Sequence, residues 1–357
     1  MIEFAKGYIY TKYNCNNSEF DSNLICNLSL DAKVNFLLML PYSLITFKKV
    51  EELLKNDYKE YWKKVDIRSI NDEDTLKYSI SKLMEVHRYR RVLWMYRLTT
   101  NKKAVKYDNN ILLTCLEKLD SNFNQFDICE SIKDLQKEKN IDINRLFYIE
   151  WKFLPLLNYG DYRPITMEKV IASDANRYSE ILQLAFKEHS KSKIKSNNNI
   201  DTNLATNAYR LLHQWKFVPG TDIDGYINSN KLKRWYENMK NICKKIDRLE
   251  IGLSYFGRVL FYSPKDKECF WIDKTVAEII NNNETIRNGY KKEAFNSVGV
   301  VNCDENGTAY NKKSDEYKER AIITELAGYN NFATALREIS HNFKFHAEYM
   351  KDTYKDF

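Results

Sequence analysis

Apolar residues recur every three or four positions along most of this chain, and that spacing predicts amphipathic helices. The clearest helix spans 229–249, where one face is apolar and the other is mostly charged. Its apolar positions are Leu232, Trp235, Tyr236, Met239, Ile242, Cys243, Ile246 and Leu249. The same spacing predicts further helices over 29–40, 46–54, 72–87, 92–98, 108–120, 125–138, 142–157, 174–188, 202–216, 250–262, 271–281, 284–295, 312–327 and 331–352. Asp31 is the expected cap of the first helix and Ser229 that of the clearest one.

Two stretches lack this helical spacing. Residues 1–27 are irregular, and GYIYTKY at 7–13 is compatible with a short strand. The polar stretch HSKSKIKSNNNID at 189–201 has the composition of a linker. We therefore expect an N-terminal helical domain over 1–188 and a C-terminal helical domain over 202–357.

The fold class that follows is all-α. Only 10 glycines and 5 prolines occur in 357 residues, whereas sandwiches and doubly wound sheets need many of both for their tight turns. Successive helices with short breaks predict either an irregular array of helical hairpins (a HEAT-like or TPR-like α-solenoid) or a multi-helix bundle. No fixed period is present, and the tetratricopeptide and ankyrin signatures are absent. A degenerate HEAT-type array remains compatible, since it needs only the apolar faces.

Composition adds little about function. The net charge of +7, from 56 basic and 49 acidic residues, permits an anionic partner without demanding one. The 7 cysteines are scattered without a CxxC pair, which is typical of reduced thiols, and we expect a cytoplasmic protein. No signal peptide is visible and no apolar run reaches the ~18 residues that a membrane span needs.

The loop GTDIDGYIN at 220–228 resembles the middle of an EF-hand calcium loop. With Gly225 at position 6, Asp222 and Asp224 take positions 3 and 5. Position 1 is then Gly220 and position 12 is Lys231, so two essential oxygen ligands are missing. The pattern instead predicts a turn in which Gly225 has a positive φ, followed by a helix.

Two basic clusters are candidates for binding nucleic acid or a protein partner. In HRYRRVLWMYR, 87–97, the arginines alternate with aromatic residues, a composition found at RNA and single-strand contacts. Its candidates are Arg88, Arg90, Arg91 and Arg97. The second cluster is the charged face of the helix over 229–249. Its candidates are Lys233, Arg234, Lys240, Lys244, Lys245 and Arg248. The alternative for the first cluster is a helix-hairpin turn with exposed arginines, and for the second it is a solvated face without a ligand.

Catalytic patterns are missing. The five histidines show no zinc-ligand spacing, and neither a phosphate-binding glycine loop nor a nucleophile elbow occurs. Helical ribonucleases of the HEPN class place four to six residues between Arg and His, whereas Arg337–His341 and Arg210–His213 leave fewer. His346 falls in register with the apolar residues of its helix, which predicts a core position. We assign no catalytic residue, metal or cofactor.

Several segments resemble one bacterial family: FLLMLPYSLITFKKVEELL, EYWKKV, LMEVHRYRRVLWMYRL, LFYIEWKFLPLL, AYRLLHQWKFVPGTDIDGYINSNKLKRWYENM, FGRVLFYSP and FNSVGVV. The resemblance extends over roughly residues 36–350 and is to the C-terminal helical region of long bacterial proteins without assigned chemistry. Val298 departs from the pattern, which has Arg there, and this departure puts an anion contact at that loop in doubt. The resemblance implies a helical, repeat-like, non-catalytic module. By analogy of fold, such modules act as sensors or scaffolds, including in phage defence.

We therefore expect a non-catalytic helical module that binds a protein partner. The alternatives are an RNA- or DNA-binding protein that uses 87–97 and 231–248, and a helical nuclease built on His213, His341 or His346.

Overall fold

The computed structural model describes residues 7–8, 11, 25–68, 70, 72–100, 108–120, 124–157, 161–186, 202–298 and 306–355. Throughout these residues the regular secondary structure is helical and no strand occurs, so the all-α prediction is confirmed. Thr221 and Ile227 form an isolated antiparallel bridge. The described positions of 7–13, which are Gly7, Tyr8 and Thr11, are helical and not extended.

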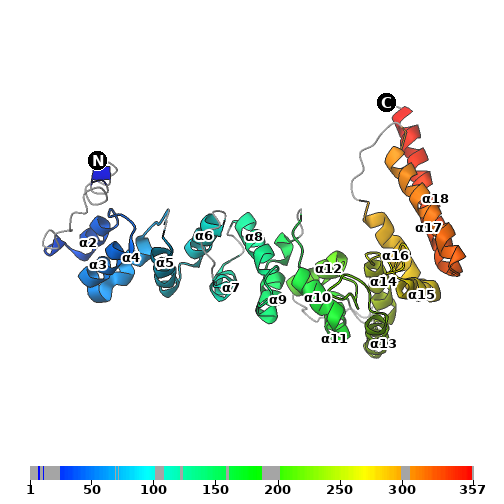
Figure 1. Cartoon of the computed structure of the whole chain (residues 1–357), viewed down its shortest axis with the longest axis horizontal. Helices are drawn as coiled ribbons and strands as arrows, with labels where there is room; N and C mark the ends of the chain where they lie inside the picture. Colours follow the sequence, from blue (N-terminus) through cyan, green and yellow to red (C-terminus); the bar gives the residue numbers. More distant parts are fainter. Residues whose placement is uncertain are drawn as a thin grey trace. The chain divides into compact units, whose positions relative to one another are not determined.

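The chain forms two compact units, Met1–Ile149 and Glu150–Phe357. Their helices are labelled in Figure 1. The first unit contains α2 (Leu30–Leu37), α3 (Leu44–Leu54), η2 (Lys55–Asp57), α4 (Tyr58–Lys64), α5 (Glu73–Glu85), α6 (Tyr89–Thr100), α7 (Asn109–Lys118), α8 (Gln125–Leu135) and most of α9 (Ile143–Lys152). The second contains η3 (Leu154–Leu156), α10 (Ile165–Ser173), α11 (Ala175–Ala185), α12 (Thr202–Gln214), α13 (Ser229–Lys245), α14 (Leu249–Leu260), α15 (Lys274–Asn282), α16 (Glu284–Asn296), α17 (Thr308–Leu326) and α18 (Asn330–Lys355).

Within each unit the helices pack mainly on helices close to them in sequence. In the first unit α5 contacts α6, and α6 contacts both α7 and α8. In the second unit α11 contacts α10, α12 and α13, and α17 packs along α18. Packed neighbouring helices are what a multi-helix array consists of, while the type of repeat stays a prediction.

The expected linker over 189–201 lies outside the described residues. The helices on either side of it, α11 and α12, pack together in the second unit. The compact units therefore divide the chain at a different place from the polar stretch.

Short polar side chains set where the helices begin. A side-chain oxygen of the residue before the helix accepts a hydrogen bond from a first-turn N–H, which would otherwise lack a partner. These caps are Ser29, Ser43, Asp72, Asp108, Asn124, Asp174, Asn228, Asp273 and Asn283. Two predicted caps were wrong: Ser29 and not Asp31 caps α2, and Asn228 and not Ser229 caps α13.

Helices α4 and α10 were not predicted. Helix α10 follows Pro164 and has no cap of its own. The buried Glu150 carboxylate of α9 replaces that cap, since it accepts hydrogen bonds from the backbone N–H groups of Thr166 (3.1 Å) and Met167 (2.9 Å). The start of α10 thus depends on a residue that lies well before it in the sequence.

An aromatic cluster forms the core of the first unit. The ring of Trp62 lies 4.9 Å from that of Phe47 and 5.5 Å from that of Tyr61, centroid to centroid, and all three side chains are fully buried. Trp62 Nε1 donates to Glu51 Oε1 at 3.2 Å, so its polar atom is satisfied. The cluster joins α3 to α4.

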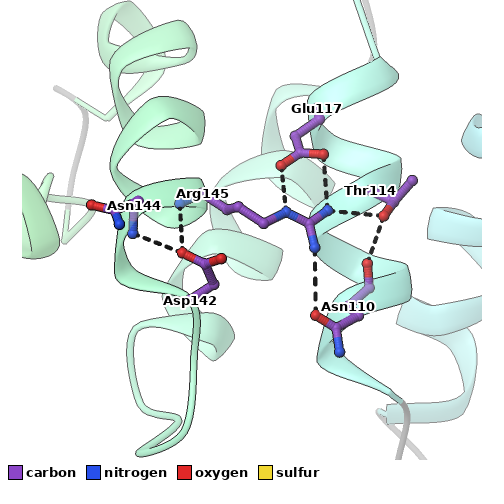
Figure 2. Close-up of polar contacts among 6 residues, drawn as sticks. All are labelled: Asn110, Thr114, Glu117, Asp142, Asn144 and Arg145. Carbon is purple, nitrogen blue, oxygen red and sulfur yellow. Dashed lines mark hydrogen bonds and ion pairs between the residues drawn. The ribbon is translucent and has the colours of Figure 1, made fainter.

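Helix α9 is joined to α7 by Arg145 (Figure 2). Its Nε and Nη2 donate to the two carboxylate oxygens of Glu117 at 2.7 and 2.9 Å, and Nη2 also donates to Thr114 Oγ1 at 2.9 Å. A two-point arrangement of this kind fixes the angle of the guanidinium as well as its position. The hydrogen bond from Arg145 lowers the pKa of Glu117 from its ordinary value.

The second unit has its own aromatic core around Tyr178. The ring of Tyr178 lies 5.1 Å from that of Trp215 and 5.4 Å from that of Trp235. The Tyr178 hydroxyl donates to the carbonyl of Gly252 at 2.7 Å, and Trp235 Nε1 donates to the carbonyl of Ile171 at 3.2 Å. These two bonds tie α11 to α14 and α13 to α10.

Helices α14 and α16 cross at a pair of glycines. A Cβ on Gly289 would lie 2.0 Å from the carbonyl oxygen of Ser254 and 3.2 Å from the Cα of Gly257. A Cβ on Gly257 would lie 2.2 Å from the carbonyl oxygen of Ile286. The two backbones therefore approach to a distance that no side chain would permit.

The last two helices, orange and red in Figure 1, form an antiparallel hairpin. Ser314 of α17 and Ser340 of α18 exchange hydrogen bonds inside it: each hydroxyl donates to the other residue's carbonyl, at 2.9 and 2.8 Å. Both serines are buried, so the pair fixes the register of the two helices.

Candidate binding surfaces

Arg88, a predicted binding residue, closes the end of one helix and caps another. His87 before it has a φ of 59°, and the Arg88 N–H donates to the carbonyl of Leu83 at 2.9 Å, which ends α5. Its guanidinium donates to the carbonyls of Trp62 and Val65 at the end of α4. Burial lowers the pKa of Arg88 from its ordinary value. The side chain thus satisfies carbonyls that α4 leaves without partners.

Arg248 occupies the same kind of turn in the second unit. Asp247 has a φ of 54°, and the Arg248 N–H donates to the carbonyl of Cys243 at 2.9 Å, which ends α13. The guanidinium donates to the carbonyls of Phe186 at 3.0 Å and Ile246 at 2.6 Å. Only 9% of Arg248 is exposed, so it does not belong to the charged outer face on which the sequence placed it.

Arg91 and Arg97 are also engaged within the first unit. Arg91 pairs with Asp66, with 2.7 Å between Nη2 and Oδ1. Arg97 pairs with Asp134 at 2.9 Å and with Glu130 at 3.5 Å, and 11% of its side chain is exposed. Both guanidiniums therefore neutralise carboxylates of their own unit.

The exposed arginine among the four candidates of this cluster is Arg90, which borders a small pocket of about 270 Å³ in the first unit. Arg90 Nη2 lies 2.6 Å from Oδ1 of Asp120, which lines the same pocket. The pocket is lined by His87, Arg88, Tyr89, Arg90, Arg91, Lys118, Leu119 and Asp120. Asp120 offsets the charge of Arg90, and the other cations of the lining are Arg88, Arg91 and Lys118.

Helix α13 carries the second predicted cluster. Its apolar face is buried as expected, at Leu232, Trp235, Met239 and Cys243. On the outer face Lys233 pairs with Glu278 at 2.9 Å and Lys240 with Glu237 at 3.1 Å. Both pairs are solvent-exposed, and such pairs contribute at most ~1 kcal/mol. Arg234, Lys244 and Lys245 are exposed and make no ion pair within the described residues.

A larger pocket, of about 600 Å³, opens beside Arg234 in the second unit. It lies between the end of α10, the start of α11, the turn before α13 and α13 itself. Its lining residues are Lys169, Ala172, Ser173, Asp174, Ala175, Phe217, Gly220, Thr221, Lys231, Arg234, Trp235 and Asn238. Sequence reasoning found Arg234 but missed Lys169, Phe217 and Asn238, which no motif connects to it.

In the loop that resembles a calcium site, a lysine side chain pairs with one of the aspartates. Lys231 Nζ lies 2.5 Å from Asp222 Oδ1, and Asn228 Nδ2 donates to the other carboxylate oxygen at 3.3 Å. The hydrogen bond from Lys231 lowers the pKa of Asp222. Gly225 has the predicted positive φ, 82°. The ammonium group of Lys231, at position 12 of the loop, therefore occupies the Asp222 carboxylate that a calcium ion would need as a ligand.

His213 lies in a half-buried polar cluster. Its Nδ1 is 2.9 Å from the carbonyl of Tyr209, which can only accept, so Nδ1 carries the proton. Nε2 is then the acceptor for the Tyr255 hydroxyl at 3.2 Å. Burial lowers the pKa of His213. Nearby, Arg258 pairs with the buried Glu293 at 2.8 Å, which leaves that carboxylate neutralised.

The other histidines considered for catalysis lie on the surface. His341 and His346 of α18 are both exposed. The prediction of a core position for His346 was wrong: its ring stacks on that of Tyr310 with centroids 5.7 Å apart, whereas Phe343 takes the buried position. No acidic or arginine partner of either histidine is recorded among the described residues.

The hairpin of α17 and α18 exposes large apolar side chains. On α17, Ile322, Ile323 and Leu326 are 49%, 46% and 83% exposed. On α18, Phe345 and Tyr349, four residues apart on one face, are each 61% exposed. Charge-based sequence reasoning did not detect this surface.

Comparison with protein families, curated proteins and solved structures finds no match to this chain. Across the described ranges, no group of three or more His, Cys, Asp or Glu side chains is placed to hold a metal ion. Within the same ranges, every helix is too short or too polar to span a bilayer. The all-helical character that the family resemblance implies is present, and the family itself stays an expectation.

Proposed function

We propose that this chain is a non-catalytic helical module that binds a protein partner through the outward faces of α17 and α18, acting as a scaffold or sensor in a bacterial system. The observation that carries the proposal is the exposed apolar group Ile322, Ile323 and Leu326. Contiguous exposed aliphatic side chains are uncommon on monomeric proteins and mark interaction surfaces.

The position of this group supports the proposal. Helix α17 buries Ser314, Tyr317, Ala321 and Thr324, which form the face toward the rest of the unit. Ile322 and Leu326 are four residues apart on the opposite side, where an outermost helix of an array normally carries polar residues. Burying three such aliphatic side chains in an interface would contribute several kcal/mol at ~25 cal/mol per Å².

Helix α18 offers a second outward group. Its buried positions include Phe332, Leu336, Ile339 and Phe343, whereas Phe345 faces away from them. Large aromatic side chains at exposed positions are enriched among the residues that dominate binding energy at protein interfaces. A partner that contacts one helix or the other can use rigid helical surface without ordering a loop.

The nucleic-acid alternative draws less support from the contacts. Arg88, Arg91, Arg97 and Arg248 already donate to carbonyls or carboxylates of their own unit. A phosphate would have to compete with those bonds. The nuclease alternative needs a histidine beside a free acid or arginine, and the half-buried His213 is held by tyrosines.

The test is a pull-down from the native host with the full chain as bait, followed by cross-linking. We expect a specific partner that is retained by the wild type and lost with the double variant Ile322→Glu and Leu326→Glu. Both side chains are exposed, so the double variant should melt at the wild-type temperature. Ile45→Glu is the matched control, since Ile45 is 81% exposed on α3 of the other unit.

Two outcomes would refute the proposal. One is the absence of any partner that survives washing at physiological salt. The other is a partner that the double variant retains and the Ile45→Glu control loses. Retention that falls steeply with salt and after nuclease treatment would instead favour the nucleic-acid alternative.

A further inference from the structure

The pocket beside α13 combines free positive charge with an aromatic wall. Lys169 and Arg234 both line it, both are exposed, and neither makes an ion pair within the described part of the chain. The Lys169 ammonium lies 5.8 Å from the centre of the Phe217 ring, which is half-buried in the same wall. A volume of about 600 Å³ lies within the range of small-molecule sites.

The other charges of the pocket are already balanced. Lys231 is paired with Asp222. Asp174 caps α11, where its carboxylate accepts from the N–H of Asn176 at 2.8 Å and faces the positive end of the helix. The net excess at this site therefore comes from Lys169 and Arg234.

The arrangement of donors favours a phosphate over a single carboxylate. A guanidinium binds phosphate oxygens in a two-point fashion, and a lysine ammonium adds a point charge. Asn238 lies one helical turn after Arg234 and lines the same pocket, so its amide adds a further donor. Phe217 supplies a flat apolar surface on which an unsaturated ring can stack.

We propose that this pocket binds a small anionic ligand with a flat unsaturated ring, of the class of nucleoside phosphates. Arg234 and Lys169 hold the phosphate, and the ring packs on Phe217. The site is separate from the apolar faces of α17 and α18, so this inference does not rest on the proposed protein interface.

The test is calorimetric titration of the full chain with adenosine diphosphate, with pyrophosphate and adenosine as partial probes. We expect saturable one-to-one binding of adenosine diphosphate. Arg234→Ala weakens it at least about tenfold, since it removes the two-point contact. Phe217→Leu weakens the binding of adenosine diphosphate several-fold and leaves the binding of pyrophosphate unchanged, because only the nucleotide carries a ring.

Lys245→Ala is the matched control, because Lys245 is an exposed cation on the same helix that does not line the pocket. It should bind like the wild type, and a thermal melt should show that all three variants remain folded. Absence of saturable binding by adenosine diphosphate would overturn the proposal. So would an equal loss with Lys245→Ala, which would indicate general charge attraction, or pyrophosphate binding that the nucleotide does not exceed.

Discussion

Replacing Gly289 by alanine should destabilise the second unit, although alanine is the better helix former. The added Cβ would lie 2.0 Å from the carbonyl oxygen of Ser254, where an ordinary contact needs at least 3.4 Å. The obstacle is backbone and not a flexible side chain, so α14 and α16 must move apart by more than about 1 Å. Overpacking of this kind costs ~1–3 kcal/mol.

The helix propensity of alanine returns part of that cost, about 1 kcal/mol relative to glycine. Because the clash is with backbone, we take the upper part of the overpacking range and expect a net loss of about 2 kcal/mol. For a unit of about 200 residues this corresponds to a melting temperature about 4–8 °C lower. Thermal unfolding of the full chain, followed by circular dichroism and tryptophan fluorescence, measures it.

Gly252→Ala is the matched control on α14. Its Cβ would meet Cys243 Sγ at 3.0 Å and Leu182 Cδ1 at 3.3 Å, which are side-chain atoms that can shift. The control gains the same propensity, so its stability should stay within about 1 kcal/mol of the wild type. If Gly289→Ala melts as high as Gly252→Ala, the backbones do not approach as closely as described and the reasoning fails.

Four further predictions concern charge and pH. Arg145 lowers the folded-state pKa of Glu117, so the stabilisation by this pair is present above the unfolded pKa of ~4.3 and is lost as the pH falls through the folded pKa. In urea unfolding, the Glu117→Gln variant should therefore lose less stability than the wild type between about pH 5 and 3. An equal loss in both proteins would contradict the pairing. The pKa of His213 is lowered by burial, so the unfolded chain binds its proton first and stability declines as the pH falls below ~6.5. His213→Phe should show a shallower decline between about pH 7 and 5, and a steeper one would refute the assignment. Arg248→Lys should lower the free energy of unfolding by about 2 kcal/mol in the same assay, since one ammonium cannot reach both carbonyls; wild-type stability would show that Arg248 is not a cap. Millimolar calcium should leave the melting temperature unchanged because the ammonium of Lys231 already pairs with the loop carboxylate, and a saturable rise would contradict this.

The sequence predicted most helices because apolar periodicity reports which face is buried. In α13 the buried residues Leu232, Trp235, Met239 and Cys243 follow the predicted spacing. Helix α4 was not predicted because its seven residues are too few to show a helical repeat of apolar positions. Its buried side chains, Tyr61 and Trp62, are also adjacent in the sequence. Helix α10 was not predicted because its cap is supplied by Glu150, a residue of another helix.

The candidate sites were harder to predict, since charge in a sequence does not reveal its partner. Arg234 and Arg248 read alike as basic residues of one helix. The structure places the first at an open pocket and turns the second inward to carbonyls of the chain. Lys169 and Phe217 belong to the same pocket as Arg234, yet they come from a different helix and from a loop. Only tertiary packing brings such residues together.

Helices α5, α13 and α17 end in the same type of turn, and the three turns are unequally spaced along the chain. In each case an N–H donates to the carbonyl five residues earlier: Arg88 to Leu83, Arg248 to Cys243, and Tyr329 to Thr324. The residue before each donor has a positive φ, and it is His, Asp and Gly in turn. This turn requires one left-handed residue and no fixed side chain. A chain poor in glycine can therefore repeat the same helix connection without leaving a repeated motif in its sequence.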